Sequence, residues 1–182
     1  MEIAVDSINR NQPEDTHQHL SGAEATQRIR DLAEDAGSCF FSTNAPHSET
    51  RGTRPMGVEK VDDAGHLWFL SASDSHKNRE IEADPNVRIF MQGSKHAGFM
   101  VLDGIASIHR DKALIDALWD PIMKTWFTGG KDDSRITVIE VAPVTGYYWD
   151  NKHGSLVAAT KMMIGAAIGK TLDDSVEGRL NP

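Results

Sequence analysis

The chain has 182 residues, of which 39% are hydrophobic and 25% are charged, and this balance is that of one ordinary globular domain. Its net charge of −8 argues against general nucleic-acid binding, which needs basic surfaces to neutralise phosphates. Because Cys39 is the single cysteine, an internal disulfide is impossible and a cysteine-based zinc site is not expected.

The first residues carry no targeting signal. Residues 1–20 have neither a basic start nor an apolar run, and no window reaches the ~20 apolar residues needed to cross a membrane. We therefore expect a cytoplasmic protein without membrane contact, in which residues 1–20 form a polar, mobile tail. Stray histidines such as His17 and His19 are common in polar tails, so we predict no metal site.

The first predicted element is an amphipathic helix over Ser21–Ala36. Ser21 and Glu24 have the spacing of a capping box, and apolar residues follow at helical spacing. Gly37 stands where a glycine commonly ends a helix.

Six strands are predicted next, with short helices between some of them. Their aromatic and β-branched content and their turn-rich boundaries are typical of antiparallel strands joined by short connections. The expected strands are 38–43, 53–61, 66–71, 86–92, 98–109 and 135–149. A turn at 62–65 predicts that strands 53–61 and 66–71 form a hairpin. The helices and connections expected beside them are helices at 75–83, 111–119 and 156–168, a loop at 128–134 and a polar tail at 171–182.

This order of elements predicts a mainly β protein with peripheral helices. Strands and helices do not alternate regularly, which disfavours a doubly wound parallel sheet. We expect a small antiparallel barrel with helices packed outside it. One domain should cover 21–160, and 161–182 should form the end of the last helix and a tail.

The segment Ser73–Arg79 is the most informative part of the sequence, because a strand ends and a helix begins there. His76, Lys77 and Arg79 stand in the first helical turn, although the partial positive charge of a helix N-terminus disfavours cations. A bound anion explains this choice, since the free amides already favour negative charge and Ser75 adds a hydroxyl. A phosphate suits the set. The alternative is a solvated helix start whose cations are balanced by nearby acidic side chains.

Arg54 lies on the predicted strand 53–61 and would approach the same anion across the hairpin. Its planar guanidinium suits a phosphate, whereas the alternative is a surface salt bridge. Met56 and Gly57 follow on this strand and would offer backbone groups to a flat ring.

Two groups of residues resemble a known family. The pyridoxamine 5′-phosphate oxidase-like, FMN-binding split barrels are similar to this chain at Arg54-Pro55-Met56, Ser71, Ser75-His76-Lys77 and Asn86–Ile89. The general stress protein 26 branch of that family is similar at Leu118-Trp119, Trp126-Phe127, Gly129–Asp133 and Tyr148–Asp150. The resemblance covers roughly residues 21–158.

The resemblance implies a six-stranded antiparallel split β-barrel of Greek-key order that forms a homodimer, with FMN in a groove at the subunit interface. Arg54 and Lys77 would hold the phosphate, with Ser75 and His76 beside it. The residues that would line the isoalloxazine ring are Met56, Val58, Leu70 and Ser71, together with Trp126 as an aromatic from the second subunit. For Trp126, packing in the core or at the dimer interface is the alternative. The expected anchors of the interface are Trp119, Trp126, Phe127 and Trp149.

One departure from the family bears on the activity. The true oxidases carry a C-terminal set of Trp, Arg, His and Arg that holds pyridoxal phosphate, and residues 161–182 lack it. Pyridoxamine phosphate oxidation is therefore not expected. The leading hypothesis is an FMN-dependent oxidoreductase with a small-molecule redox partner and an unidentified substrate, in which the flavin supplies the redox chemistry. The alternatives are a non-catalytic flavin-binding or stress-response protein, or a split barrel that uses FAD, the deazaflavin F420 or pyridoxal phosphate. No residue is assigned as a catalytic acid or base.

Overall fold

The fold is known from a computed structural model, which describes residues 16–45, 48–93, 98–151 and 175–182. The helix expected at 156–168 lies outside these residues. The described strands are β1 (Leu20–Ser21), β2 (Ser38–Thr43), β3 (Thr53–Gly57), β4 (Lys60–Val61), β5 (Leu67–Ala72), β6 (Asn86–Gln92), β7 (Phe99–His109), β8 (Ile136–Asn151) and β9 (Ser175–Asn181). The described helices are α1 (Ala23–Ala36), α2 (His76–Ala83) and α3 (Lys112–Leu118), with 3₁₀ turns η2 (Pro121–Thr125) and η3 (Gly130–Asp132).

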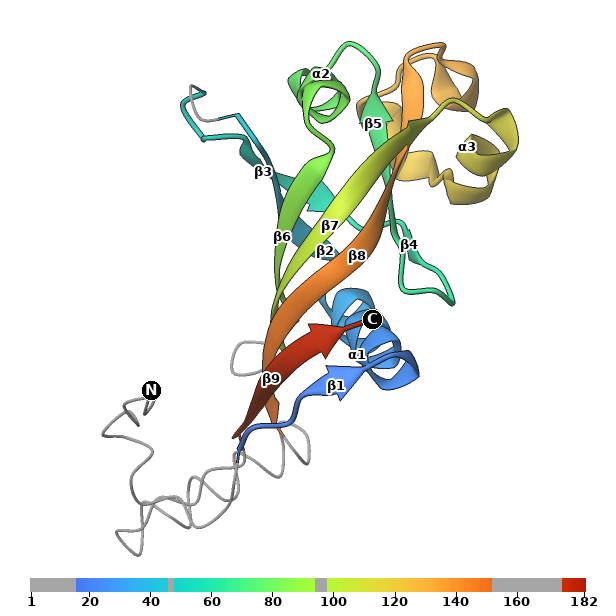
Figure 1. The fold of residues 1–182 in the computed structure, drawn as a ribbon. Coiled ribbons are helices and arrows are strands. Elements are labelled where there is room, and N and C mark those ends of the chain that lie inside the picture. Colours follow the sequence, from blue (N-terminus) through green and yellow to red (C-terminus); the bar gives the residue numbers. More distant parts are fainter. Residues whose placement is uncertain (1–15, 46–47, 94–97, 152–174) are drawn as a thin grey trace, which may run out of the picture.

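The strands form one mixed sheet of nine strands, so the expectation of a six-stranded antiparallel barrel is only partly right. Strands β3, β2, β6, β7, β8 and β5 follow one another in antiparallel register, as expected. Within the described residues no ladder joins β3 to β5, so the sheet curves strongly without closing (Figure 1). The extra strands arise because β8 has 16 residues: its first part pairs with β5 and its last part with β9.

The expected polar tail over 171–182 is wrong for its described part. Ser175–Asn181 form β9, which pairs with β8 and, in parallel, with β1. Every second residue of β9 is buried, including Val176 and Leu180, so the strand completes the core despite its polar composition. Residues just before β1 are also ordered against β9, since Gln18 N donates to Glu177 O at 2.8 Å. The expected N-terminal tail therefore does not extend to residue 20.

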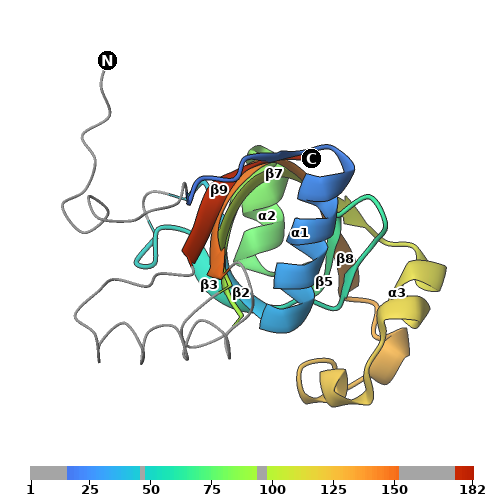
Figure 2. The same cartoon turned by 90° about the horizontal axis from the view of Figure 1, so that it is seen from below.

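Helix α1 lies across one end of the curved sheet, and α2 lies near the other end (Figures 1 and 2). The side chains that α1 buries in the core are Ala25, Ile29, Leu32 and Ala33. The predicted glycine end is confirmed, because Gly37 has φ 60° and donates its N–H to Ala33 O. The predicted capping box is wrong: Gly22 is the N-cap and has no side-chain bond. Ser21 belongs instead to β1, where it pairs with Asn181.

The segment expected as one strand over Thr53–Val61 is divided between two partners. Strand β3 pairs with β2, and the Val58 N–H still donates to Gly37 O at 3.0 Å. From Glu59 on, the hydrogen bonds run to β5, where Glu59 N donates to Trp68 O at 2.9 Å. The hairpin through the turn at 62–65 is therefore confirmed for β4 and β5 alone, and Arg54 does not lie on it.

Two hydrophobic clusters support this frame. The main core lies between the inner face of the sheet and α1. The second core joins β5 and β8 to the segment that carries α3 and η2, and its buried residues are Leu70, Ile115, Leu118, Phe127, Ile136 and Val138. In the described part of the chain, no helix has the length and apolar character needed to cross a membrane.

Candidate functional site

The start of α2 is fixed by a buried network of polar side chains. Ser75 is the N-cap, and its hydroxyl accepts from Asn78 N at 3.4 Å. Asn78 is fully buried; its Oδ1 accepts from Ser71 Oγ at 2.5 Å and its Nδ2 donates to Thr137 Oγ1 at 2.9 Å. Thr137 Oγ1 in turn donates to Ser71 O at 3.1 Å. These bonds tie the first turn of α2 to β5 and β8, because buried polar groups need partners.

Arg54 reaches α2 from β3. Its Nη2 donates to Glu80 Oε2 at 2.7 Å, and Thr43 Oγ1 donates to the same oxygen at 2.5 Å. The Arg54 and Glu80 side chains are only 22% and 18% exposed. Arg54 Nη1 is buried and has no hydrogen-bond partner within the described part of the chain. A guanidinium nitrogen is always a donor, so this nitrogen requires an acceptor.

The Arg54–Glu80 pair also sets the charge state of Glu80. Burial acts to raise the pKa of Glu80, but hydrogen bonds from Thr43 and Arg54, with the charges of Arg54 and His76, outweigh it and lower the pKa. Glu80 is therefore held as a carboxylate, and one of its oxygens is already occupied by two donors.

Lys77 adds a second cation beside Arg54. Burial lowers the pKa of Lys77, and the charge of Arg54 lowers it further, while Glu80 and Asp74 offset part of this effect. Among the residues that the structure describes, none makes a hydrogen bond or ion pair with the Lys77 ammonium. Arg54 and Lys77 thus lie close together near the start of α2, with Glu80 bonded to Arg54 and Asp74 also nearby, and an anion would relieve the repulsion between the two cations.

The other expected phosphate ligands have different surroundings. The Ser75 hydroxyl is engaged with Asn78, and His76 is exposed with Nδ1 3.5 Å from Arg79 Nη2. The structure therefore brings Arg54 and Lys77 together, with Ser75 at the same helix start and His76 on its outer side.

The residues expected to line a ring lie on the two strands that flank the unpaired edge of the sheet. On one side, Met56 and Val58 are half-buried and their side chains pack against the main core. On the other side, Leu70 is buried in the second core and Ser71 belongs to the Asn78 network. Within the described residues no hydrogen-bond ladder joins β3 to β5, and this unpaired stretch is the opening between the two strands.

Trp126 lies apart from this group in the single chain. It is the C-cap of η2 and is 63% exposed. No hydrogen bond or ring contact in the described part of the chain joins it to Arg54 or Lys77. Its expected role in a partner subunit stays a prediction.

The sequence reasoning missed the residues that organise the site. Glu80 was considered only as a nearby acid, while Thr43, Asn78 and Thr137 were not considered. A signal for Asn78 exists, because it lies three residues before Ile81 on the buried face of α2, and a polar side chain on such a face needs partners.

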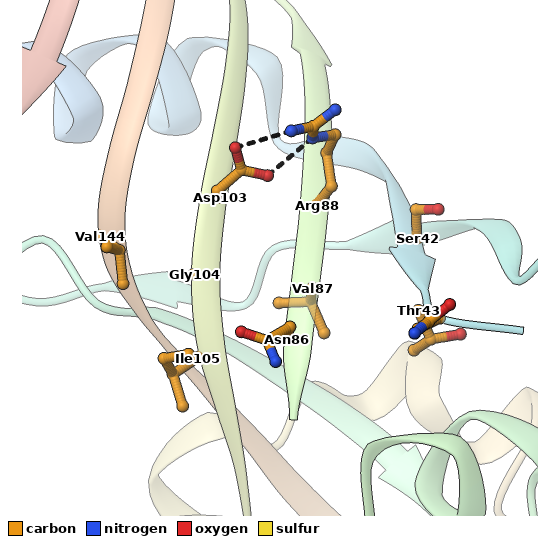
Figure 3. A pocket seen from close by; sticks show the side chains of 10 residues that line it. Ser42, Thr43, Asn86, Val87, Arg88, Asp103, Gly104, Ile105 and Val144 are labelled. Carbon is orange, nitrogen blue, oxygen red and sulfur yellow. Dashed lines mark hydrogen bonds and ion pairs between the residues drawn. The ribbon is translucent and has the colours of Figure 1, made fainter. Parts of the chain in front are cut away.

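Two cavities lie on the outer face of the sheet, and neither is lined by Arg54 or Lys77. The larger, of about 390 Å³, crosses β2, β6, β7 and β8 (Figure 3). Arg88 on β6 and Asp103 on β7 form a two-bonded ion pair at one end, and Ile105 and Val144 line the opposite wall (Figure 3). The second cavity has about 350 Å³, and the residues that line it include Phe40, Pro55, Phe90 and Phe99.

Comparison with known proteins places this arrangement in a family. Residues 24–173 match the sequence model of the family described as pyridoxamine 5′-phosphate oxidase like. Protein bli-3 of Neurospora crassa is 28% identical over 134 residues, which cover 67% of this chain and 64% of that protein. General stress protein 26 of Bacillus subtilis is 34% identical over 81 residues, which cover 42% of this chain and 56% of that protein. The chain thus matches less than two thirds of the length of either relative.

Solved structures share the fold. A protein from Jannaschia sp. CCS1, described as general stress protein 26, matches with a TM-score of 0.73 and 20% identity, covering 88% of this chain and 100% of that chain. A protein from Xanthomonas citri, described as a general stress FMN/FAD binding protein, matches with a TM-score of 0.55 and 22% identity, covering 65% of this chain and 82% of that chain.

Proposed function

Since the chain belongs to the pyridoxamine 5′-phosphate oxidase-like family, we propose that it binds FMN and that Arg54 and Lys77 hold the phosphate. The observation that carries this proposal is the buried Arg54 Nη1, which has no acceptor among the described residues and lies beside a second, partly buried cation. A phosphate supplies acceptor oxygens for Arg54 Nη1 and negative charge for the Lys77 ammonium. The structurally similar protein from Xanthomonas citri is described as FMN/FAD binding, which supports a flavin as the ligand.

The isoalloxazine ring would then lie along the opening between β3 and β5. One end of this opening is at Val58, where hydrogen bonding to the start of β2 stops. Met56 flanks the opening on one strand, and Leu70 and Ser71 flank it on the other. A flat ring can approach the strand backbone closely here, because the side chains of Met56 and Leu70 pack in the two cores and that of Ser71 bonds to Asn78. The phosphate would lie at the α2 end of the same opening.

The proposed activity is that of an oxidoreductase. FMN, when bound, accepts and donates a hydride or single electrons, and the protein contributes binding, orientation and electrostatics. The polar network at Asn78 would fix the phosphate end, and a ring anchored at one end presents a constant edge to a small-molecule partner.

We also propose a homodimer that associates through the outer face of the sheet. One cross-strand row on this face runs over five strands, and its members in order are Tyr147, Val101, Phe90, Phe40 and Pro55. Residues paired across antiparallel strands lie on one face, so the row is continuous. Phe40 is 58% exposed and Phe90 is 43% exposed, which is unusual for large apolar side chains on adjacent strands.

The shape of this face also fits a second copy. Phe40 and Phe90 line the cavity of about 350 Å³, and the cavity of about 390 Å³ lies on the same sheet face across β2 and β6. A two-fold interface places the same patch on both partners, so the aromatic row of one copy can fill the hollows of the other. Of the expected interface anchors, Trp149 would lie in this interface. It is on β8, two residues after Tyr147, and is 44% exposed.

The test of flavin binding compares FMN, FAD and riboflavin by absorption and fluorescence titration. The wild-type protein should bind FMN more tightly than riboflavin, which lacks the phosphate. In Arg54→Ala and Lys77→Ala the FMN affinity should fall about ten- to a hundredfold, because each removes one charge-assisted hydrogen bond of roughly 1.5–3 kcal/mol. Riboflavin affinity should change little. Arg79→Ala is the matched control, since it removes an exposed cation from the same helix.

Equal affinity for FMN and riboflavin in the wild-type protein would exclude the phosphate site. Preference for FAD over FMN would move the assignment to the dinucleotide. Once FMN is bound, anaerobic reduction by NADH or NADPH, followed by reoxidation with an added acceptor, tests the oxidoreductase. Tight FMN binding without reduction by any donor would favour the non-catalytic alternative.

A further inference from the structure

Glu59 occupies the point where the chain passes from β3 to β4. Its N–H donates to Trp68 O at 2.9 Å, the first hydrogen bond that joins this segment to β5. Alternation along the strand puts its side chain on the side of Pro55 and Gly57, opposite the core-facing Met56 and Val58.

The carboxylate of Glu59 lies over the backbone of Gly57. A Cβ added to Gly57 would meet a single neighbour within contact distance, Glu59 Oε1 at 3.5 Å. Gly57 itself is exposed, so the strand is bare at this position except for the carboxylate. Gly57 stands between Met56 and Val58, the segment assigned to the ring. Glu59 is therefore at the end of the opening that lies away from Arg54.

This carboxylate has unused binding capacity. Glu59 is half-buried, and no hydrogen bond or ion pair of its side chain is found within the described ranges of the chain. Burial raises the pKa of Glu59, and the nearby charge of Asp120, the N-cap of η2, raises it further. A carboxylate that is partly desolvated beside a like charge gains from a cation or from N–H and O–H donors.

The opening is therefore electrically two-ended. Arg54 and Glu59 are five residues apart, which is about 16 Å at ~3.3 Å per extended residue. The α2 end carries two cations, Arg54 and Lys77, with the carboxylates of Glu80 and Asp74 beside them, and the other end carries Glu59 with Asp120 nearby. The phosphate of a bound ligand would occupy the α2 end of the opening. The end near Glu59 would then remain free for a second molecule.

We propose that Glu59 determines substrate charge: the reacting partner of the flavin is a cationic or neutral molecule that donates an N–H or O–H to Glu59, and anionic partners are disfavoured. This inference rests on the proposed function, because it assumes that a flavin ring occupies the opening. Selection works by attraction and by repulsion, since an anion would lie against an unpaired carboxylate. Glu59 is assigned as a specificity-determining residue and not as a proton donor to the flavin.

The experiment uses the FMN-loaded protein and three probes of similar shape: benzylamine, benzyl alcohol and benzoate. Their binding is followed by the perturbation of the flavin absorption spectrum in wild type, Glu59→Gln, Glu59→Lys and Glu34→Gln. Glu34 is an exposed acid on α1, so Glu34→Gln removes the same unit of charge from a protein of net charge −8 without touching the opening. FMN affinity is measured for every variant first.

We expect the wild-type protein to bind benzylamine roughly tenfold more tightly than benzoate. This is the effect of exchanging attraction for repulsion between the Glu59 carboxylate and a unit charge ~5–6 Å away in a water-like dielectric. The preference should disappear in Glu59→Gln, reverse in Glu59→Lys and persist in Glu34→Gln. Because the FMN phosphate is held at the other end, the FMN affinity should change less than threefold in Glu59→Gln and Glu34→Gln.

Equal binding of the three probes by FMN-loaded wild type, or an unchanged preference in Glu59→Gln and Glu59→Lys, would overturn the role of Glu59 while leaving FMN binding intact. A wild-type protein that fails to bind FMN would overturn both proposals. A loss of preference in Glu34→Gln equal to that in Glu59→Gln would also refute the assignment, because net charge would then explain it.

Discussion

Asn78 on α2 donates a 2.9 Å hydrogen bond from Nδ2 to Thr137 Oγ1 on β8, and both residues are fully buried. This contact joins a helix to a strand 59 positions further along the chain. It makes the start of α2, and with it Lys77, a rigid part of the sheet rather than a mobile loop end.

Replacing Asn78 should therefore destabilise the protein and loosen the phosphate site. Asn78→Leu removes the acceptor of Ser71 Oγ and the amide that donates to Thr137 Oγ1, and each buried polar group left unsatisfied costs about 1–3 kcal/mol. We expect a loss of about 2–4 kcal/mol in the free energy of unfolding, measured by urea denaturation. A double-mutant cycle with Thr137→Val isolates the coupling, and strict additivity of the two losses would contradict it.

The carboxylate of Glu80 should make stability depend on acid pH. Its pKa is lowered in the folded protein, so its contribution is present above the pKa of the unfolded chain, near the ordinary 4.5, and is lost as pH falls through the folded pKa. Glu80→Gln should lower the free energy of unfolding by roughly 1.5–3 kcal/mol at pH 7, and the difference should shrink in acid. Glu82→Gln, on the exposed side of α2, should show no such difference at either pH.

Cys39 should be chemically inert in the folded state. Burial raises the pKa of its thiol to about 12, so at pH 8 only about one molecule in ten thousand carries the thiolate. Iodoacetamide should label Cys39 slowly in native protein and rapidly in 6 M guanidinium, as counted by mass spectrometry. Fast native labelling would mean that the strand around Cys39 opens.

Gly178 should be required for the pairing of β9 with the residues before β1. A Cβ at this position would overlap the carbonyl oxygen of Gln18, whereas at Gly57 its nearest neighbour would be 3.5 Å away. Gly178→Ala should cost about 1–3 kcal/mol and speed amide exchange at residues 16–21. Gly57→Ala should leave unfolding nearly unchanged, and equal costs for the two variants would argue against close packing at Gly178.

The row through Phe40 and Phe90 should hold the dimer. Phe40→Asp with Phe90→Asp places two carboxylates at the centre of the apolar face, and buried unpaired charge opposes association. Sedimentation at micromolar concentration should change from dimer to monomer, with the circular dichroism spectrum retained. Ile122→Asp is the control, because Ile122 is 64% exposed on η2, outside the row.

Much of the fold follows from local sequence signals. The strand at Asn86–Gln92 alternates buried and exposed residues without exception, and the end of α1 at Gly37 follows from the left-handed conformation that glycine favours. The charges at the predicted helix start and on the predicted strand 53–61 pointed to Lys77 and Arg54, and the family resemblance added the split-barrel fold and supported both residues.

The missed features depend on contacts between distant segments. Strand β9 contains Glu177, Gly178 and Arg179, a local composition typical of a tail, and its pairing becomes evident only with β1 and β8 in place. The same holds for the Arg54–Glu80 pair, which forms because β3 pairs with β2 instead of β5. Local propensity does not determine which of two possible neighbours a short strand chooses.

The parallel pairing of β1 with β9 has a consequence for synthesis of the chain. Ribosomes release the N-terminal segment first, so Leu20 and α1 emerge long before Val176 and Leu180, the residues that cover them. Until β9 appears, the apolar face of α1 and the second edge of β8 lack their final partner, and an unpaired strand edge invites contact with other chains. The edge of β8 that β9 covers therefore stays without its partner from the synthesis of Ile136–Asn151 until Ser175–Asn181 follow, and we expect the nascent protein to need chaperone shielding during this interval.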